Sequence, residues 1–128
     1  SPILKGKIVS GNRRGRKLGF PTANVKVPVD ILIPKNGVYL GEVLLKGSHH
    51  LTVINIGNRP TFGCGERLIE AHLLDFQEDV YGKDIEITLV KRLRDEKIFA
   101  NQQDLIEQIR KDIEIAVKFY EELEQQQA

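Results

Sequence analysis

Six short segments rich in β-branched residues fill the first ninety residues of this 128-residue chain, and this pattern restricts the possible folds most strongly. The segments lie near residues 5–10, 22–27, 37–45, 50–56, 68–75 and 85–91. None keeps a sustained helical period, and the last alternates strictly, with Ile85, Ile87 and Leu89 on one face. Glycine-containing turns at Lys46-Gly47-Ser48 and Tyr81-Gly82-Lys83 predict hairpins. These features predict an antiparallel sheet or a small barrel.

The last quarter of the chain changes period. Apolar residues recur there at steps of three and four positions, which predicts an amphipathic helix of about twenty residues. They are Leu105, Ile109, Ile113, Ala116, Val117 and Tyr120. Asn101 is the expected N-cap, and Asp104 lies early enough to favour the helix dipole. We expect this apolar stripe to pack on the barrel; the alternative is an element that binds a partner.

Size, charge and cysteine content exclude several classes of protein. The length suits one domain with a real core, so we interpret residues 1–128 as a single domain. The formal net charge is +1, which gives no overall attraction to nucleic acid or to an anionic membrane. Cys64 is the single cysteine, which excludes an internal disulfide, and no apolar run approaches the length that spans a bilayer. These observations favour a reduced, cytoplasmic setting without nucleic acid or membrane as partner.

A basic, glycine-rich segment lies between the first two expected strands. Gly11, Gly15 and Gly19 allow backbone conformations that bring amide groups close to an anion. The cations among them are Arg13, Arg14, Arg16 and Lys17. The segment therefore predicts a phosphate-binding loop, while the plainer interpretation is a solvated basic turn. No Walker-type Gly-Lys-Ser/Thr sequence is present to decide between the two.

Thr22 and Asn24 follow this loop at a spacing of two. In a strand their side chains point the same way, so the hydroxyl and the amide oxygen can share one cation. Mg²⁺ commonly takes only one or two protein ligands when phosphates complete its coordination, and the pair therefore indicates phosphoryl transfer. The alternative is structural: the two residues begin a strand, and Asn24 satisfies a backbone group.

Glu70 is the candidate general base. It lies within Leu68-Ile69-Glu70-Ala71-His72-Leu73-Leu74, an otherwise apolar stretch where a carboxylate is costly unless it is paired or used. The alternative is a strand-edge glutamate that faces water. His72 shares the face of Glu70 in an extended segment, and it either orients the carboxylate or has a purely structural role.

An ordered set of motifs gives the chain a resemblance to a known family. The sequence Gly15-Arg16-Lys17-Leu18-Gly19-Phe20-Pro21-Thr22-Ala23-Asn24 resembles the nucleotide-binding signature of riboflavin kinases, particularly the kinase module of bacterial bifunctional FAD synthetases. Further matching motifs are Gly37-Val38-Tyr39, residues 55–62, Glu70-Ala71-His72 leading to Asp75-Phe76, Asp79-Val80-Tyr81-Gly82, and Arg94 with Glu96 and Phe99. The resemblance extends from about Gly6 to Leu123.

The resemblance implies a mainly β fold, a small closed antiparallel Greek-key barrel of about six strands with the C-terminal helix packed on it. It implies an ATP:riboflavin 5′-phosphotransferase that converts riboflavin and ATP to FMN and ADP within FMN and FAD biosynthesis, with Mg²⁺ as cofactor. It also implies a covalently attached N-terminal adenylyltransferase domain in the full protein. The lack of any methionine, including at position 1, favours a piece of a longer polypeptide.

The resemblance also assigns roles to individual residues. Glu70 is the implied catalytic base, and Thr22 and Asn24 are the implied ligands of Mg²⁺. The residues expected to bind nucleotide or flavin are Gly11, Gly15, Arg16, Lys17, Gly19, Phe20, Pro21, Thr22, Asn24, Asn55, Arg59, Arg94 and Phe99. For Arg59, a surface salt bridge is an equal alternative.

Two further segments and one other class of function complete the expectations. Residues 55–62 predict a structured loop, and the charged residues 91–97 predict a linker before the helix, which the resemblance makes a mobile flap near the ligands. The alternative function is a non-catalytic small barrel that binds nucleic acid or flavin. Sparse aromatic residues weaken the nucleic-acid version, because Phe20 stands alone near the basic loop.

Overall fold

The computed structural model describes residues 3–11, 22–28, 31–59, 66–73 and 81–127. The chain divides into two compact units, Ser1–Glu96 and Lys97–Ala128. The first unit carries all the described strands, and the second carries the C-terminal helix.

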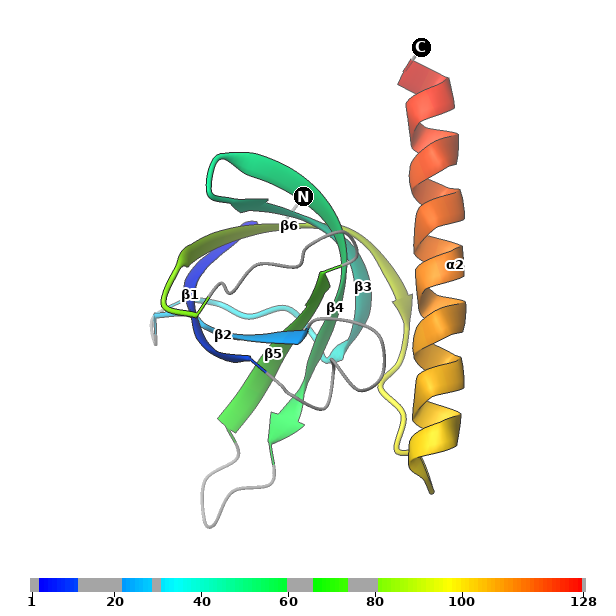
Figure 1. The fold of residues 1–128 in the computed structure, drawn as a ribbon, viewed down its shortest axis with the longest axis horizontal. Coiled ribbons are helices and arrows are strands. Elements are labelled where there is room, and N and C mark those ends of the chain that lie inside the picture. Colours follow the sequence, from blue (N-terminus) through cyan, green and yellow to red (C-terminus); the bar gives the residue numbers. More distant parts are fainter. Residues whose placement is uncertain (1–2, 12–21, 29–30, 60–65, 74–80, 128) are drawn as a thin grey trace. The chain divides into compact units, whose positions relative to one another are not determined.

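The first unit is a closed barrel of six antiparallel strands (Figure 1). The strands are β1 (Ile3–Gly11), β2 (Thr22–Lys26), β3 (Gly37–Leu45), β4 (Ser48–Arg59), β5 (Glu66–Leu73) and β6 (Asp84–Arg94). Their order around the barrel is β1-β2-β5-β4-β3-β6, and pairing of β1 with β6 closes it. The run β2-β5-β4-β3 is a Greek-key order, because β3, β4 and β5 are consecutive and β2 lies beside β5. The predicted barrel is therefore confirmed.

Alternating apolar residues from every strand fill the barrel. The fourteen buried residues of this core are Leu4, Ile8, Ala23, Val25, Tyr39, Val43, Leu45, Ile54, Ile56, Ile69, Ala71, Ile85, Ile87 and Leu89. The inward direction predicted for the alternating residues of β6 is confirmed. Thr52 is also fully buried, and its hydroxyl donates a hydrogen bond to the His72 carbonyl oxygen at 2.7 Å. Side chains next to these inward positions must point to the outer face of the sheet.

The turn between β3 and β4 follows the predicted chemistry. Lys46 and Gly47 adopt positive φ angles of 51° and 79°, which suit a two-residue hairpin whose twist matches that of the strands. Gly82 likewise has φ of 79°, and its amide donates a hydrogen bond to the Ile8 carbonyl oxygen at 2.8 Å. The hairpin predicted at Lys46-Gly47-Ser48 is therefore confirmed. The hairpin predicted at Tyr81-Gly82-Lys83 is wrong, because β6 pairs with β1 and β3 and not with the preceding strand β5.

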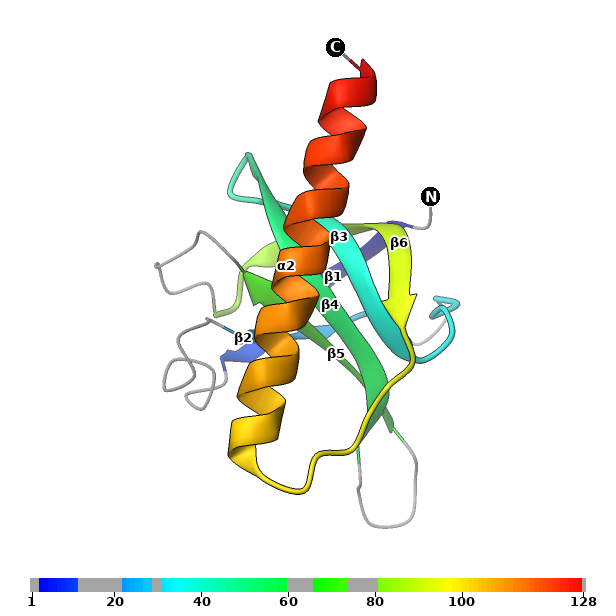
Figure 2. The same cartoon turned by 90° about the vertical axis from the view of Figure 1, so that its right-hand side faces the viewer.

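The second unit contains one uninterrupted helix, α2 (Gln102–Gln127) (Figure 2). The Asp104 amide donates a hydrogen bond to Asn101 Oδ1 at 2.9 Å, which confirms the predicted N-cap. The helix begins where this N-cap predicts and is 26 residues long, so it extends beyond the predicted length at its C-terminal end. Within the described part of the chain, no helix combines the length and the apolar character that spanning a membrane requires.

Two strands continue into segments predicted as loop or linker. β4 runs to Arg59 and pairs there with β5, so Asn55 and Asn58 are strand residues and not loop residues. Its Gly57 pairs with Leu68 within the strand, and the lack of a side chain there leaves room for the Glu96 carboxylate, which a Cβ would overlap. β6 runs to Arg94, which pairs with Val38 of β3. The predicted linker therefore begins at residue 95.

Candidate active site

Three polar residues from neighbouring strands lie side by side in one row across the sheet. Glu70 of β5 pairs with Asn24 of β2 on one side and with Asn55 of β4 on the other. Directly opposed residues of antiparallel strands have Cα atoms roughly 4.5–5.5 Å apart. The barrel thus places the carboxylate of Glu70 between two amide side chains, which we call the polar row.

The polar row points to the outer face of the barrel. Each member lies between two buried core residues of its own strand, as Glu70 lies between Ile69 and Ala71. All three polar side chains are half-buried. A carboxylate at such a position loses part of its hydration but stays accessible to a ligand.

A bulge in β1 borders the polar row. The pairing of β1 with β2 shifts register between Ile8 and Ser10, and Ser10 lies opposite Asn24. Bulges are frequent beside active sites because they bend a strand and redirect its side chains. This one lies directly beside Asn24, a member of the polar row.

Asn55 carries an acceptor that the described residues leave unsatisfied. Its Oδ1 atom is buried and has no hydrogen-bond partner within the described part of the chain. A buried acceptor without a donor costs roughly 1–3 kcal/mol, so such an atom is usually matched by a ligand, an ion or water. Its place beside Glu70 makes a ligand donor or a cation a suitable partner.

Arg94 lies in line with the polar row, farther around the barrel on β6. Asn55 pairs with Val38 of β3, and Val38 pairs with Arg94 at the end of β6. The Arg94 Nη1 atom donates a hydrogen bond to the Asp95 carbonyl oxygen at 2.9 Å. A cation therefore lies three strands away from Glu70, along the same line across the sheet.

The other predicted site residues lie outside the polar row or outside the described residues. Thr22 begins β2 opposite His72, Gly11 ends β1 opposite Ala23, and Arg59 ends β4. Phe99 belongs to the second unit. The predictions for Gly15, Arg16, Lys17, Gly19, Phe20 and Pro21 lie outside the described residues.

The structure also contains a polar network that the sequence analysis did not predict. Arg67 of β5 donates hydrogen bonds to the Ile33 carbonyl at 2.9 Å, to the Pro34 carbonyl, and to Asn36 Oδ1 at 2.9 Å. The Asn36 Nδ2 atom donates in turn to Asn58 Oδ1 of β4 at 3.3 Å. The segment that precedes β3 is thereby fastened to β4 and β5.

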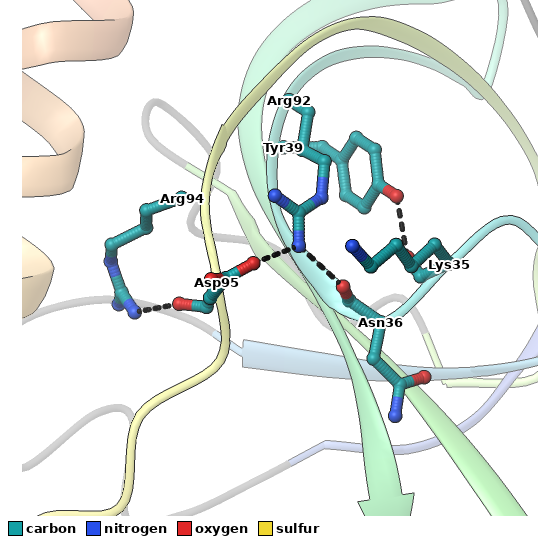
Figure 3. A network of polar contacts seen from close by, with 6 residues as sticks. All are labelled: Lys35, Asn36, Tyr39, Arg92, Arg94 and Asp95. Atoms are coloured by element: carbon teal, nitrogen blue, oxygen red, sulfur yellow. Dashed lines mark hydrogen bonds and ion pairs between the residues drawn. The ribbon is translucent and has the colours of Figure 1, made fainter.

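Arg92 joins the same segment to the end of β6 (Figure 3). Its Nη2 atom donates to the Asn36 carbonyl oxygen at 2.9 Å and to Asp95 Oδ1. The hydrogen bond that Arg92 donates to Asp95 raises the pKa of Arg92 above its ordinary value and lowers the pKa of Asp95. Nearby, the Tyr39 hydroxyl donates to the Lys35 carbonyl oxygen. These contacts join residues up to 56 positions apart, so no local sequence signal could have revealed them.

Asp95→Asn is expected to lower stability at neutral pH and to have little effect in acid. The pKa of Asp95 lies below its ordinary value of 3.8, so its contribution is fully present above that value and is lost as the pH falls through the folded-state pKa. The effect should be small because the carboxylate is exposed. Denaturant unfolding of both proteins at pH 7 and at about pH 2.5 measures this. An equal difference at both pH values would show that the charge of Asp95 is not responsible.

The oxygen donors of the polar row fit Mg²⁺ shared with phosphates better than a metal held by protein alone. Within the described ranges, no group of three or more His, Cys, Asp or Glu side chains is placed to hold a metal ion. Mg²⁺ usually retains waters and combines one or two protein ligands with substrate phosphates. The amide oxygens of Asn24 and Asn55 and the carboxylate of Glu70 are donors of the required oxygen type.

A separate open cavity of about 780 Å³ lies over β1 and β6. Because these strands stand opposite β4 and β5 in the closed strand order, the cavity is not centred on the polar row. Four lysines contribute to its lining: Lys5, Lys7, Lys26 and Lys46. Its apolar lining among the described residues is aliphatic, with no aromatic ring on which a base could stack.

Comparisons with known proteins agree with this architecture. The family model described as riboflavin kinase (Flavokinase) matches residues 2–120. The RNA-binding riboflavin kinase RibR of Bacillus subtilis is 42% identical over 93% of this chain and 51% of its own length. The bifunctional riboflavin kinase/FMN adenylyltransferase of the same organism is 39% identical over 94% of this chain and 39% of its own length.

A solved structure extends the agreement to three dimensions. The riboflavin kinase from Trypanosoma brucei superposes with a TM-score of 0.67 and 28% identity, over 93% of this chain and 79% of that one. The chain spans about half or less of the two curated Bacillus relatives, and it corresponds to their kinase part. This chain therefore belongs to the riboflavin kinase (flavokinase) family and is homologous to the kinase module of the bacterial bifunctional enzymes and to RibR.

Proposed function

We propose that this chain is an active riboflavin kinase that transfers the γ-phosphoryl group of ATP to the 5′-hydroxyl of riboflavin, giving FMN and ADP. The observation that carries the proposal is the polar row, in which Glu70 stands between Asn24 and Asn55 on the outer face of the barrel. Membership of the flavokinase family supports the choice of riboflavin and ATP as substrates. Phosphoryl transfer needs positioning, charge neutralisation and a group that takes the hydroxyl proton, and the polar row offers candidates for each.

Glu70 is the proposed general base. Its carboxylate accepts the proton of the riboflavin 5′-hydroxyl as that oxygen bonds to the γ-phosphorus and the bond to the ADP oxygen breaks. The buried neighbours Ile69 and Ala71 hold its strand in place, so the position of the carboxylate is set by core packing.

Mg²⁺, when bound with ATP, would supply positive charge that offsets the charge of the phosphates. Thr22 and Asn24 are its proposed protein ligands, because they follow each other at a spacing of two on β2. The unsatisfied Asn55 Oδ1 lies on the other side of Glu70 and is a suitable acceptor for a substrate hydroxyl or a metal-bound water.

Basic and glycine residues complete the proposed binding site. Gly11, Gly15, Arg16, Lys17, Gly19, Phe20 and Pro21 form the proposed phosphate-binding loop, and Arg59, Arg94 and Phe99 are proposed to contact the ligands. Arg94 is the member of this set with the clearest support, since it ends β6 opposite Val38, which itself pairs with Asn55 of the polar row. Its cation would lie where phosphate charge accumulates.

The natural protein is proposed to carry this kinase as one part of a longer cytoplasmic chain. The homologous Bacillus enzyme is bifunctional and includes an FMN adenylyltransferase activity by name. An adenylyltransferase domain joined to this kinase would use the FMN formed here as its substrate.

Incubation of the purified chain with Mg²⁺, ATP and riboflavin should yield FMN and ADP without FAD. One kinase site is proposed within this chain, so a second, adenylyl-transferring reaction should be absent. Chromatography of the flavin products, with the chain lacking ATP as control, measures both. FAD formed by this chain alone would refute the assignment of a single kinase activity, and a folded chain that forms no FMN would refute the proposed function.

The alternative is a non-catalytic barrel that binds nucleic acid or flavin. Four lysines and two carboxylates, Asp84 and Glu86, line the cavity over β1 and β6, and the excess of positive charge favours an anionic partner. One relative is an RNA-binding riboflavin kinase by name. The aliphatic lining described there disfavours base stacking, and the polar row has no role in such a module. Formation of FMN by the chain would exclude the non-catalytic version.

A further inference from the structure

We propose that Arg92 is a positioning residue for the reaction, a role that rests on the proposed function. By holding Asp95 against the start of β3, it fixes the course of the chain beyond β6. The position of Arg94 is then set before any ligand binds. Arg92 itself touches no substrate and acts through Asp95.

One guanidinium nitrogen of Arg92 joins two separate parts of the barrel. Its Nη2 atom donates both to the Asn36 carbonyl oxygen, just before β3, and to Asp95 Oδ1, just after β6 (Figure 3). A carboxylate bonded to a guanidinium makes a stronger and better directed hydrogen bond than a neutral pair does. The exit from β6 is thus tied to the entry into β3.

Gly37 makes this close approach possible. A Cβ atom at residue 37 would lie 2.8 Å from both Nε and Nη2 of Arg92, and 2.9 Å from the Arg94 carbonyl oxygen. The guanidinium therefore rests directly on the backbone of Gly37, in space that any side chain would occupy. This contact explains why glycine occupies the first position of the Gly37-Val38-Tyr39 motif.

Arg94 depends on the residue that Arg92 holds. The Arg94 side chain donates to the carbonyl oxygen of Asp95, while the Asp95 side chain accepts from Arg92 (Figure 3). The next residue, Glu96, places its carboxylate against Gly57 of β4, close to the polar row. Residues 94–96 thus have fixed contacts with β3 and β4 in the protein without ligand.

The ion pair is too exposed to act mainly through stability. The side chain of Arg92 is 33% exposed and that of Asp95 is 81% exposed. Exposed ion pairs contribute little to folding, whereas a small displacement of a ligand-contacting cation can lower a rate by one or two orders of magnitude. The pair should therefore matter more for activity than for the melting temperature.

Steady-state kinetics of four variants test the proposal: Arg92→Ala, Arg92→Lys, Asp95→Ala and the double alanine variant. We expect each single alanine substitution to lower kcat/KM by roughly tenfold or more. The kcat/KM of the double variant should be no lower than that of the less active single alanine variant. Arg92→Lys should recover part of the loss, because an ammonium can still reach one of the two acceptors. Additive losses in the double variant would overturn the coupling through Asp95.

Arg67→Ala is the matched control. Arg67 also fastens the segment before β3 through three hydrogen bonds, but these go to Ile33, Pro34 and Asn36 and not to Asp95 or Arg94. This variant should lower the melting temperature at least as much as Arg92→Ala does, yet change kcat/KM less than threefold. Equal losses of activity in both variants would mean that Arg92 only supports the barrel, which would refute the positioning role.

Hydrogen exchange separates this proposal from the proposed function. Amides of residues 94–97 should exchange faster in Arg92→Ala than in the wild-type chain, and Arg67→Ala should leave them unchanged. Unchanged exchange at these amides in Arg92→Ala would overturn the proposal. If the wild-type chain forms no FMN, the kinase function fails, and exchange alone then decides whether Arg92 holds this segment.

Discussion

Glu70→Gln is expected to lower turnover by roughly 10²–10⁴-fold while riboflavin affinity stays within a few-fold. The substitution keeps the size of the side chain and its place between Asn24 and Asn55, but an amide cannot take the hydroxyl proton. The loss corresponds to about 3–5 kcal/mol of barrier height. Single-turnover kinetics give the rate of the chemical step, and flavin fluorescence titration gives the affinity.

Glu42→Gln is the matched control for this experiment. Glu42 is also a strand glutamate, and it contacts His49 on β4 at 3.1 Å, far from the polar row in the strand register. Its loss should leave turnover unchanged, because a partly exposed ion pair contributes little. Normal turnover in Glu70→Gln, with binding intact, would show that Glu70 is not the base.

Ile54→Ala is expected to lower the free energy of unfolding by roughly 2–5 kcal/mol. Ile54 is fully buried in the barrel, and its Cγ1 atom lies 3.0 Å from the position that a Cβ of Gly41 would take. Because Gly41 brings no side chain that could move into the space, the cavity left by the truncation should stay open. Denaturant unfolding of both proteins measures the difference.

Ile54→Val serves as the graded control for the cavity. Removal of one methyl group should cost roughly 0.5–1.5 kcal/mol, well below the alanine variant. Equal losses for the two variants would indicate that the Cδ1 methyl group, which both variants lack, makes the whole contribution and that the size of the cavity does not set the loss. A loss below about 1 kcal/mol for alanine would mean that the barrel collapses around the cavity.

The barrel could be predicted from the sequence because its signals are local. β3 matches its predicted bounds of 37–45, since a glycine precedes the apolar run and the Lys46-Gly47 turn ends it. The end of β4 could not be predicted, because Gly57 and Asn58 have the composition of a loop. Gly57 instead accommodates Glu96, and Asn58 accepts a hydrogen bond from Asn36. Those contacts depend on tertiary structure.

In the candidate site too, relations within one strand could be predicted from the sequence and relations between strands could not. Spacing alone links Thr22 to Asn24, since both lie on one strand. It cannot link Asn24 to Glu70 and Asn55, because the register between strands sets that relation. The Arg92 network could not be predicted either, since Asn36 comes just before β3 and Asp95 just after β6, far apart in the sequence. Long-range hydrogen bonds leave no period in the sequence.

Closure of the barrel by β1 and β6 has a consequence for how the chain is made. Leu4 of β1 pairs with Ile87 of β6, so the first and last strands of the barrel must meet before any edge disappears. During synthesis, β1 and β3 keep unpaired edges until β6 has emerged, and such edges can pair with other chains. Contacts between distant residues also form slowly. The chain is therefore most prone to aggregate during translation and refolding. The finished barrel is protected, because its six described strands all have neighbours on both sides.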